Sequence, residues 1–493
     1  MKRLVLIISL VALTILTHAQ GAVEALQYSR LNPGGTARFV GMNGAFGALG
    51  ADFSVLSTNP AGIGLYRSSE FSITPSITIG NTTSTFFNEE GSDSKTNFNL
   101  GNVGMIFTKE LPNRLNENGW KFIQFGIGIN RLNDYNNRVV LNGYNASNSL
   151  LDVYSSYATD YEIPAIEIEE DLYYDYAYDL NPAWWTYLMD TMGGGTNYVN
   201  PMIKDGVTQS LSISKWGSMN EFVMTIGGNY SDMVYIGATL GIPYLRYYEE
   251  SNYREEVDPA NVNVNDLRYF NVFRKLQTNA TGINAKFGII VKPVNWLRLG
   301  GSIHTPTYYS SVKDKNLTVF DSKWKTPDLD GYTSYTWNNS WPKEYELSTP
   351  FRASGSMAFI IGRFGLISGD YEFVNYSLAR MRAVPTYVND DIKASYTSTH
   401  NFRVGTEWRY NIFSLRAGYG YQPSPYKSNI NDGAITTYTG GLGLKFQFFY
   451  VDLAYSRSVM SEDYYLYSYD IYTAQAVNKT SINRILFTLG ARF

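Results

Sequence analysis

The 493-residue sequence contains no cysteine, only three histidines and few charged residues, 17% of the total. The absence of cysteine excludes disulfide bonds, thiolate metal sites, a cysteine nucleophile and a lipoprotein anchor. His304 and His400 lack neighbouring residues that would complete a metal, haem or catalytic site. The net charge of −4 provides no basic surface for nucleic acid. We therefore expect no enzyme activity, no cofactor, no metal and no nucleic-acid partner.

Long apolar runs are also missing, except near the start of the chain. There Lys2 and Arg3 precede an apolar stretch from Leu4 to Leu16, which is shorter than the ~20 residues that span a bilayer. Small residues follow, and the pattern predicts a signal peptide over residues 1–19 that is cleaved near Ala19. The mean hydropathy of the whole chain is −0.23, and we expect the protein to be exported and not to cross a membrane as helices.

Tyrosine and glycine are abundant, at 41 and 43 residues, and many segments alternate apolar with polar or small residues. In the last segment Ile485, Phe487 and Leu489 alternate with Arg484, Thr488 and Gly490. A period of two places the two sets on opposite faces of a β-strand. The pattern predicts fourteen strands, at residues 70–81, 96–108, 120–132, 219–230, 232–248, 276–292, 295–309, 349–361, 364–379, 397–410, 411–421, 436–447, 448–460 and 480–493.

From the third strand onward, short links alternate with long ones, so tight turns gather at one end and long loops at the other. Strands of ~10–16 residues with this arrangement are typical of bacterial transmembrane β-barrels, in which apolar residues face lipid. A soluble barrel or sandwich could also alternate, but its polar face would point outward. A sheet in hydrocarbon must close, so we expect the last strand to pair with the first. Phe493 would then also serve as an insertion signal for the barrel-assembly machinery.

The polar strand faces carry charges of both signs, which predicts cross-strand ion pairs lining the barrel. These residues are Lys286, Arg298, Arg352, Asp370, Glu372, Arg403, Glu407, Arg409, Arg416, Lys445, Asp452, Arg484 and Arg492. The main interpretation is a polar ladder that stiffens the wall. The alternative is that some of the cations attract an acidic ligand headgroup.

Residues 20–69 precede the first strand and do not alternate. They are rich in glycine and alanine, with Phe39, Met42, Phe46 and Leu49 at helical spacing. Disordered tails are seldom this apolar, so we favour a plug, or hatch, of short helices inside the barrel over a mobile tail. The expected fold is an all-β, 14-stranded antiparallel transmembrane β-barrel (70–493) with an N-terminal hatch (20–69).

The stretch "FVGMNGAFGALGADFSVLSTNPAGIGLYRSSEF" resembles the FadL/TodX family of outer-membrane transporters for hydrophobic compounds. Weaker similarity lies in "GIIVKPVNWLRLGGSIHTPTYY" and "LISGDYEFVNYS". The resemblance implies a hatch motif at Asn59, Pro60 and Ala61. It also implies ligand capture at the outer face and lateral release through a kink in the third strand. Gly126 and Gly128 are candidates for that kink, although a smooth strand with small lumen-facing residues fits them equally well.

The loop 133–218 is long, acidic and aromatic, unlike the simplest pattern of this family. Trp184, Trp185, Leu188 and Met189 offer an apolar patch for ligand capture, whereas the acidic residues would repel a carboxylate. The alternative interpretation is that the loop is a lid that shields the outer surface of the barrel.

The resulting functional hypothesis is passive transport of hydrophobic small molecules across the outer membrane of a Gram-negative bacterium. The protein would be a monomer surrounded by membrane lipid. A water-filled porin is the main alternative, favoured if the first 65 residues leave the lumen open. A surface receptor or adhesin built on the long loops, including one that binds haem, is the third.

Overall fold

The computed structural model describes residues 21–112, 119–170, 179–193, 195–200, 206–257, 267–325, 333–338, 343–427 and 430–493. The expected signal peptide lies outside these described residues. Among them, no helix combines the length and apolar character needed to cross a membrane.

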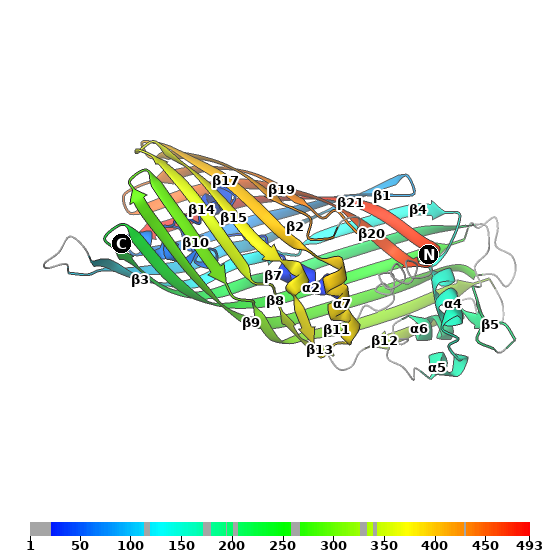
Figure 1. Ribbon diagram of the computed structural model, residues 1–493. Helices are drawn as coiled ribbons and strands as arrows, with labels where there is room; N and C mark the ends of the chain where they lie inside the picture. The colour runs from blue at the N-terminus through cyan, green and yellow to red at the C-terminus, as the bar shows by residue number, and fades with distance from the viewer. Residues whose placement is uncertain are drawn as a thin grey trace.

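The main feature is a closed antiparallel barrel of fourteen strands, as the alternation predicted (Figure 1). Its strands are β1 Glu70–Phe86, β2 Glu89–Glu110, β3 Trp120–Asp134, β7 Val207–Tyr230, β8 Val234–Glu256, β9 Leu267–Val294, β10 Leu297–His304, β14 Arg352–Ile361, β15 Gly365–Asn375, β17 Ser398–Tyr410, β18 Phe413–Gln422, β19 Ile435–Lys445, β20 Phe449–Tyr469 and β21 Tyr472–Arg492. The barrel closes between β1 and β21, where Ser69 and Phe493 exchange backbone hydrogen bonds of 3.0 and 3.1 Å.

Further strands extend the wall beyond several of these elements. They are β4 Asn137–Asn145 after β3, β11 Tyr308–Trp324 after β10, β12 Thr333–Asn338, β13 Lys343–Ser348 before β14, and β16 Arg380–Arg382 after β15. A separate two-stranded sheet pairs β5 Asp190–Thr191 with β6 Tyr198–Val199.

Several links that the sequence left outside strands contain strands in the structure. The predicted links 249–275 and 310–348 are wrong in this respect, because β8 and β9 extend into the first and β11, β12 and β13 occupy much of the second. The prediction of a long loop at 461–479 is wrong, because β20 and β21 continue through these residues and meet at a turn at Asp470. Residues 82–95 likewise belong to β1 and β2, joined by Phe87 and Asn88, both at positive φ. Outward residues of 82–95 and 461–479, such as Thr83, Gln475 and Lys479, are polar, so the apolar outer face that marks a lipid-facing strand is missing there.

Exposed apolar side chains cover the outside of the barrel, whereas their strand neighbours are buried. Ile485, Phe487 and Leu489 are exposed, while Leu486 and Thr488 between them are buried. The predicted division of β21 into two faces is therefore confirmed.

Helices occupy the lumen and close one end of the barrel. The lumenal segment contains α2 Ala22–Ser29, α3 Ala37–Gly41 and the 3₁₀ helices η1 Phe53–Ser57 and η2 Pro60–Leu65. At the end opposite the C-terminus, α4 Leu150–Asp160, α5 Ala165–Glu169 and α6 Leu180–Trp185 form a cap (Figure 1). Two further elements, η5 Tyr376–Leu378 and α7 Thr386–Ser395, lie between β15 and β17.

Candidate functional site

The hatch, residues 21–69, fills the lumen near the tight-turn end of the barrel. Its apolar core combines Phe39, Phe46 and Phe53 with wall residues such as Val223 and Leu486. Its helices contact strands on several sides, α3 against β18–β21 and η2 against β3 and β7–β9. The short N-terminal helices therefore pack inside the barrel.

Asn59, Pro60 and Ala61 are buried where η2 begins. The Asn59 side chain accepts a hydrogen bond from Ala61 N at 3.1 Å, and its Nδ2 donates to Gly47 O at 2.6 Å. The first bond caps η2, and Pro60 fits the first turn because it has no N–H to leave unpaired. A Cβ on wall residue Gly288 would lie 1.9 Å from Asn59 Oδ1. The turn thus fits against the wall only because that wall position is glycine.

Gly126 and Gly128 lie where β3 faces the hatch. A Cβ on Gly128 would lie 2.5 Å from Phe53 Cζ, and one on Gly126 would lie 2.9 Å from Leu56 Cδ1. The β2–β3 pairing runs regularly through both glycines, and the irregularities of β3 fall at Trp120/Phe122 and Arg131/Asn133. The glycines therefore make room for η1, and the structure places the distortion of the strand elsewhere.

We expect a Gly128→Ala substitution to loosen the hatch. The added carbon would also meet Val103 O at 2.3 Å, and such overpacking costs roughly 1–3 kcal/mol. Thermal unfolding in detergent measures the loss. Gly355→Ala is the matched control, because nothing lies within 4 Å of its Cβ. Equal melting temperatures for the two variants would contradict this packing.

The wall charges pair as the sequence predicted. Lys286 pairs with Glu221, and Glu372 pairs with both Arg352 and Arg403 at 3.2 and 3.6 Å. The same set of wall residues also binds the hatch backbone. Arg298 Nη1 donates to Leu49 O at 2.9 Å, and Gly47 N donates to Asp370 Oδ2 at 2.9 Å.

Arg38 provides the main ionic contact from the hatch to the wall. Its Nε lies 2.9 Å from Glu407 Oε2. Burial alone would lower the pKa of Arg38, but the carboxylates of Glu407 and Asp52 raise it above its ordinary value. Arg38 is therefore always charged, and moving the hatch requires separating a buried ion pair.

The wall has a seam between β2 and β3–β4. The β2–β3 ladder ends at the Asn102–Asn130 pair. Beyond it β2 pairs with β1, whereas β4 pairs with β7 and lies against the β1–β2 hairpin, with Val140 O 2.5 Å from an added Cβ on Gly91. At this position two sheet edges overlap without forming a continuous ladder.

Side chains bridge the seam. Lys95 of β2 donates to Ser214 Oγ at 3.1 Å and to Lys215 O at 3.0 Å, and its ammonium lies 4.9 Å from the Trp216 ring centroid. Such side-chain contacts can break without disrupting a backbone ladder. Across the seam, side-chain contacts therefore stand where the β2–β3 ladder has backbone hydrogen bonds.

The predicted capture residues all lie in the cap, but they differ in how deeply they are buried. Leu188 and Met189 are buried in the cap core, and Trp184 packs against it. Trp185 is 43% exposed and stacks on Tyr335, with the ring centroids 6.3 Å apart. Leu188 and Met189 therefore stabilise the cap core, and Trp185 is the most exposed of the four predicted capture residues.

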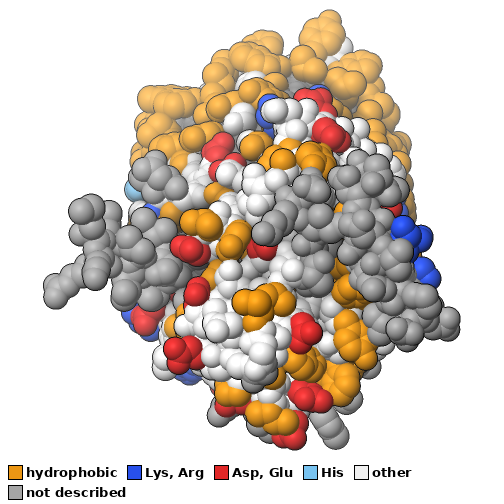
Figure 2. Space-filling model, turned by 90° about the vertical axis from the view of Figure 1, so that its right-hand side faces the viewer, with side chains coloured by type: hydrophobic (Ala, Val, Ile, Leu, Met, Phe, Trp, Pro, Cys, Tyr) orange, Lys and Arg blue, Asp and Glu red, His pale blue; other side chains and the backbone are white. Residues whose placement is uncertain are grey.

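Acidic and apolar side chains intermingle on the cap surface. The sequence from 149 to 200 has no lysine or arginine, and Figure 2, which views the cap end, shows red and orange groups side by side. Exposed apolar residues there include Tyr161, Ile166, Tyr187 and Met192. This surface favours neutral or cationic apolar molecules over anions.

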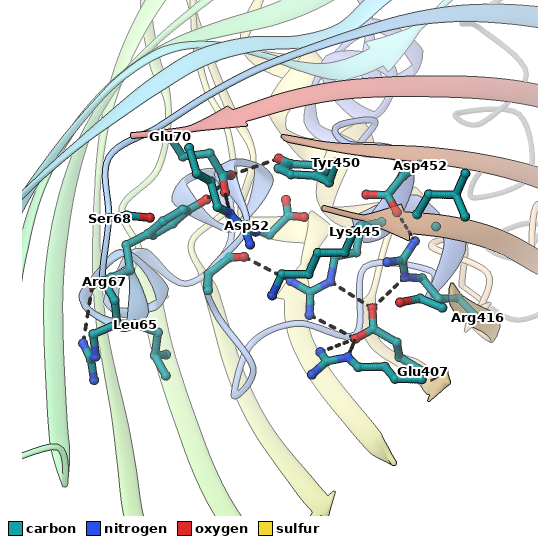
Figure 3. A pocket seen from close by; sticks show the side chains of 18 residues that line it. Asp52, Leu65, Arg67, Ser68, Glu70, Glu407, Arg416, Lys445, Tyr450 and Asp452 are labelled. Carbon is teal, nitrogen blue, oxygen red and sulfur yellow. Dashed lines mark hydrogen bonds and ion pairs between the residues drawn. The ribbon is translucent and has the colours of Figure 1, made fainter. Parts of the chain in front are cut away.

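Packing among the described residues fills much of the lumen. At the start of the hatch, Ala25 and Leu26 of α2 share a buried core with Val388 and Ile392 of α7. Two cavities beside the hatch have volumes of about 30 Å³ each, enough for about one water. A larger cavity of about 300 Å³ opens at the tight-turn end (Figure 3). Passage through the barrel therefore requires elements to move.

Comparison with solved structures identifies similar barrels. The toluene transporter TodX of P. putida is 12% identical, with a TM-score of 0.53 over 93% of this chain and 99% of that chain. A FadL homologue from Pseudomonas aeruginosa is 12% identical, with a TM-score of 0.52 over 93% of this chain and 98% of that chain. The toluene transporter TbuX of Ralstonia pickettii is 14% identical, with a TM-score of 0.50 over 93% and 98%.

No protein-family model matches the chain, and no curated protein matches its sequence. At these identities the similarity describes the fold. The chain has the FadL-type fold that the sequence resemblance implied.

Proposed function

From a fold shared with hydrocarbon transporters, we propose that this protein is a passive outer-membrane transporter of neutral hydrophobic small molecules. The observation that carries this proposal is a barrel filled by a hatch and closed by a cap that has an acidic, aromatic surface. TodX and TbuX, which share the fold, are described as toluene transporters. The alternating faces and the signal-peptide pattern support an exported, membrane-embedded barrel.

The closed lumen argues against the water-filled porin. A general porin needs a continuous aqueous channel, whereas here Phe39, Phe46 and Phe53 of the hatch are buried within the barrel. The receptor hypothesis has weaker support, because much of the long loop packs inward onto the cap core.

In our proposed mechanism the ligand first leaves water at the cap. Exposed side chains such as Trp185 and Tyr187 would hold an apolar molecule, and the surrounding carboxylates would disfavour a fatty-acid anion. The ligand would then pass between cap and hatch and leave through the seam into the membrane. Asn59, Pro60 and Ala61 would fix the resting position of the hatch, and displacement of the hatch would open the route.

Uptake of radiolabelled toluene by whole cells of a Gram-negative host tests the function. Expression of the protein is expected to raise the uptake rate at least about fivefold over cells with the empty vector. The matched comparison is radiolabelled glucose, which should enter no faster. Native mass spectrometry of the purified barrel would detect apolar molecules that copurify with it. Extraction of a second sample with organic solvent would then identify them. Faster glucose entry with unchanged toluene entry would contradict the proposal and favour the porin.

A further inference from the structure

The larger cavity lies on the opposite side of the hatch from the cap. This inner pocket has a volume of about 300 Å³, and its rim includes the ends of β17 and β19, at Arg409 and Lys445. Figure 3 shows Leu65, Arg67 and Ser68, from the last part of the hatch, on one side of the pocket and the strand ends on the other. The pocket is thus shared between hatch and wall, at the tight-turn end.

Positive charge exceeds negative charge in the inner pocket. Its lining contains six basic side chains, Arg38, Arg67, Arg409, Arg416, Lys445 and Arg492, and four acidic ones. Of the six, Arg67 is neutralised from outside the lining by Asp232, at 2.5 Å. Glu407 alone pairs with three of the arginines, Arg38, Arg409 and Arg416. A single carboxylate cannot neutralise three guanidinium groups, and Asp452 compensates only one of them, Arg416, at 2.5 Å.

Lys445 adds a charge that has no counterpart. In Figure 3 its side chain extends into the space between Glu70 and Glu407. Among the described residues, its ammonium has neither a hydrogen bond nor an ion pair. Arg492 is already bound to Glu70, with Nε 2.8 Å from Oε2. An anion entering the pocket would therefore meet a free ammonium beside partly compensated guanidinium groups.

Part of the lining is apolar. Leu65 and Leu444 contribute aliphatic surface, and the Tyr450 ring lies 5.0 Å below the Arg492 guanidinium. An inorganic anion would leave this surface unused, and a neutral hydrocarbon would leave the cations unsatisfied. A carboxylate on a compact apolar body matches both parts of the lining.

We propose that the inner pocket binds a small organic carboxylate, of the size of an aromatic acid, from the tight-turn side. Lys445 and Arg409 bind the carboxylate, while Leu65 and Leu444 contact the apolar body. Because Leu65 belongs to the hatch and Lys445 to the wall, the bound anion links the two. This site is separate from the route proposed for neutral molecules and does not depend on it.

Isothermal titration of the purified full-length barrel in detergent tests the site, with sodium benzoate as the probe. Benzoate is expected to bind saturably, and benzyl alcohol, its neutral analogue, at least about tenfold more weakly. Lys445→Gln should weaken benzoate binding about tenfold, and Lys445→Arg should restore most of it. The matched control is Lys292→Gln, which alters another lysine near a tight turn, outside the pocket lining.

Three results would overturn the proposal: equal binding of benzyl alcohol and benzoate, unchanged binding in Lys445→Gln, or tighter binding of inorganic phosphate than of benzoate. Toluene uptake by the Lys445→Gln variant is expected to equal that of the wild type. Loss of benzoate binding with intact uptake therefore separates this site from the transport function.

Discussion

Oxidation of a Gly41→Cys/Ala454→Cys variant is expected to reduce toluene uptake at least about tenfold. A Cβ built on Gly41 of α3 lies 3.7 Å from Ala454 Cβ of β20, within the ~3.5–4.5 Å that a disulfide requires. The chain has no cysteine of its own, so one defined bond would form. It would tie the hatch to the wall and prevent the displacement that the packed lumen requires.

The same wall residue offers a matched control. A Cβ on Gly441 also lies 3.7 Å from Ala454 Cβ, but both residues belong to the wall, where β19 and β20 are paired. Oxidised Gly441→Cys/Ala454→Cys should therefore transport normally. Reduction of the Gly41 variant should restore its uptake. Full uptake by the oxidised Gly41 variant would mean that the ligand passes a stationary hatch.

The barrel was predictable where lipid imposes a pattern on the sequence. Residues 485–493 alternate because one face of β21 is exposed and apolar while the other is buried. The pattern fails in 461–479, where outward residues such as Gln475 and Lys479 are polar, while the inward residues Tyr467, Ala474 and Ala476 pack into the cap core. Strand ends beyond the apolar band therefore depend on pairing between strands, as between β20 and β21, and local sequence does not reveal that pairing.

The candidate site was only partly predictable. The ionic wall followed from alternation, whereas the role of Asn59 to Ala61 as a hatch motif stays a prediction from the resemblance. Gly128 shows the limit of such reasoning. A strand glycine indicates either a bend or a close approach, and only the position of Phe53 distinguishes the two. The seam was equally hidden, because it results from β2 and β4 choosing different partners.

The role of Glu255, which anchors the cap, could not be predicted from the residues around it in the sequence either. This residue of β8 is buried and accepts hydrogen bonds from Leu150 N at 2.8 Å and from Gln209 Nε2 at 2.8 Å. The hydroxyls of Ser149 and Tyr253 also donate to it. Ser149 and Leu150 begin α4, so a wall carboxylate binds the positive end of the main cap helix.

We expect Glu255→Ala to release α4, with a loss of roughly 2–4 kcal/mol of local stability. The substitution leaves the first backbone N–H of α4, one side-chain amide and two hydroxyls without their acceptor, and buried unpaired donors are costly. Hydrogen exchange of residues 150–160 measures the effect. Chymotrypsin, which cleaves after tyrosine, gives a second readout, because the cap sequence from 149 to 200 offers trypsin no site.

The adjacent residue supplies the control. Glu256 is paired with Arg254 at 2.9 Å, and its side chain is 45% exposed, so Glu256→Ala should leave the exchange of α4 unchanged. If Glu255→Ala also exchanged as slowly as the wild type, the apolar core around Leu151 and Tyr154 would suffice to hold the cap. Faster exchange together with faster toluene uptake would identify the cap as the outer gate. Faster exchange with reduced uptake would instead mean that the docked cap forms the surface that captures the ligand.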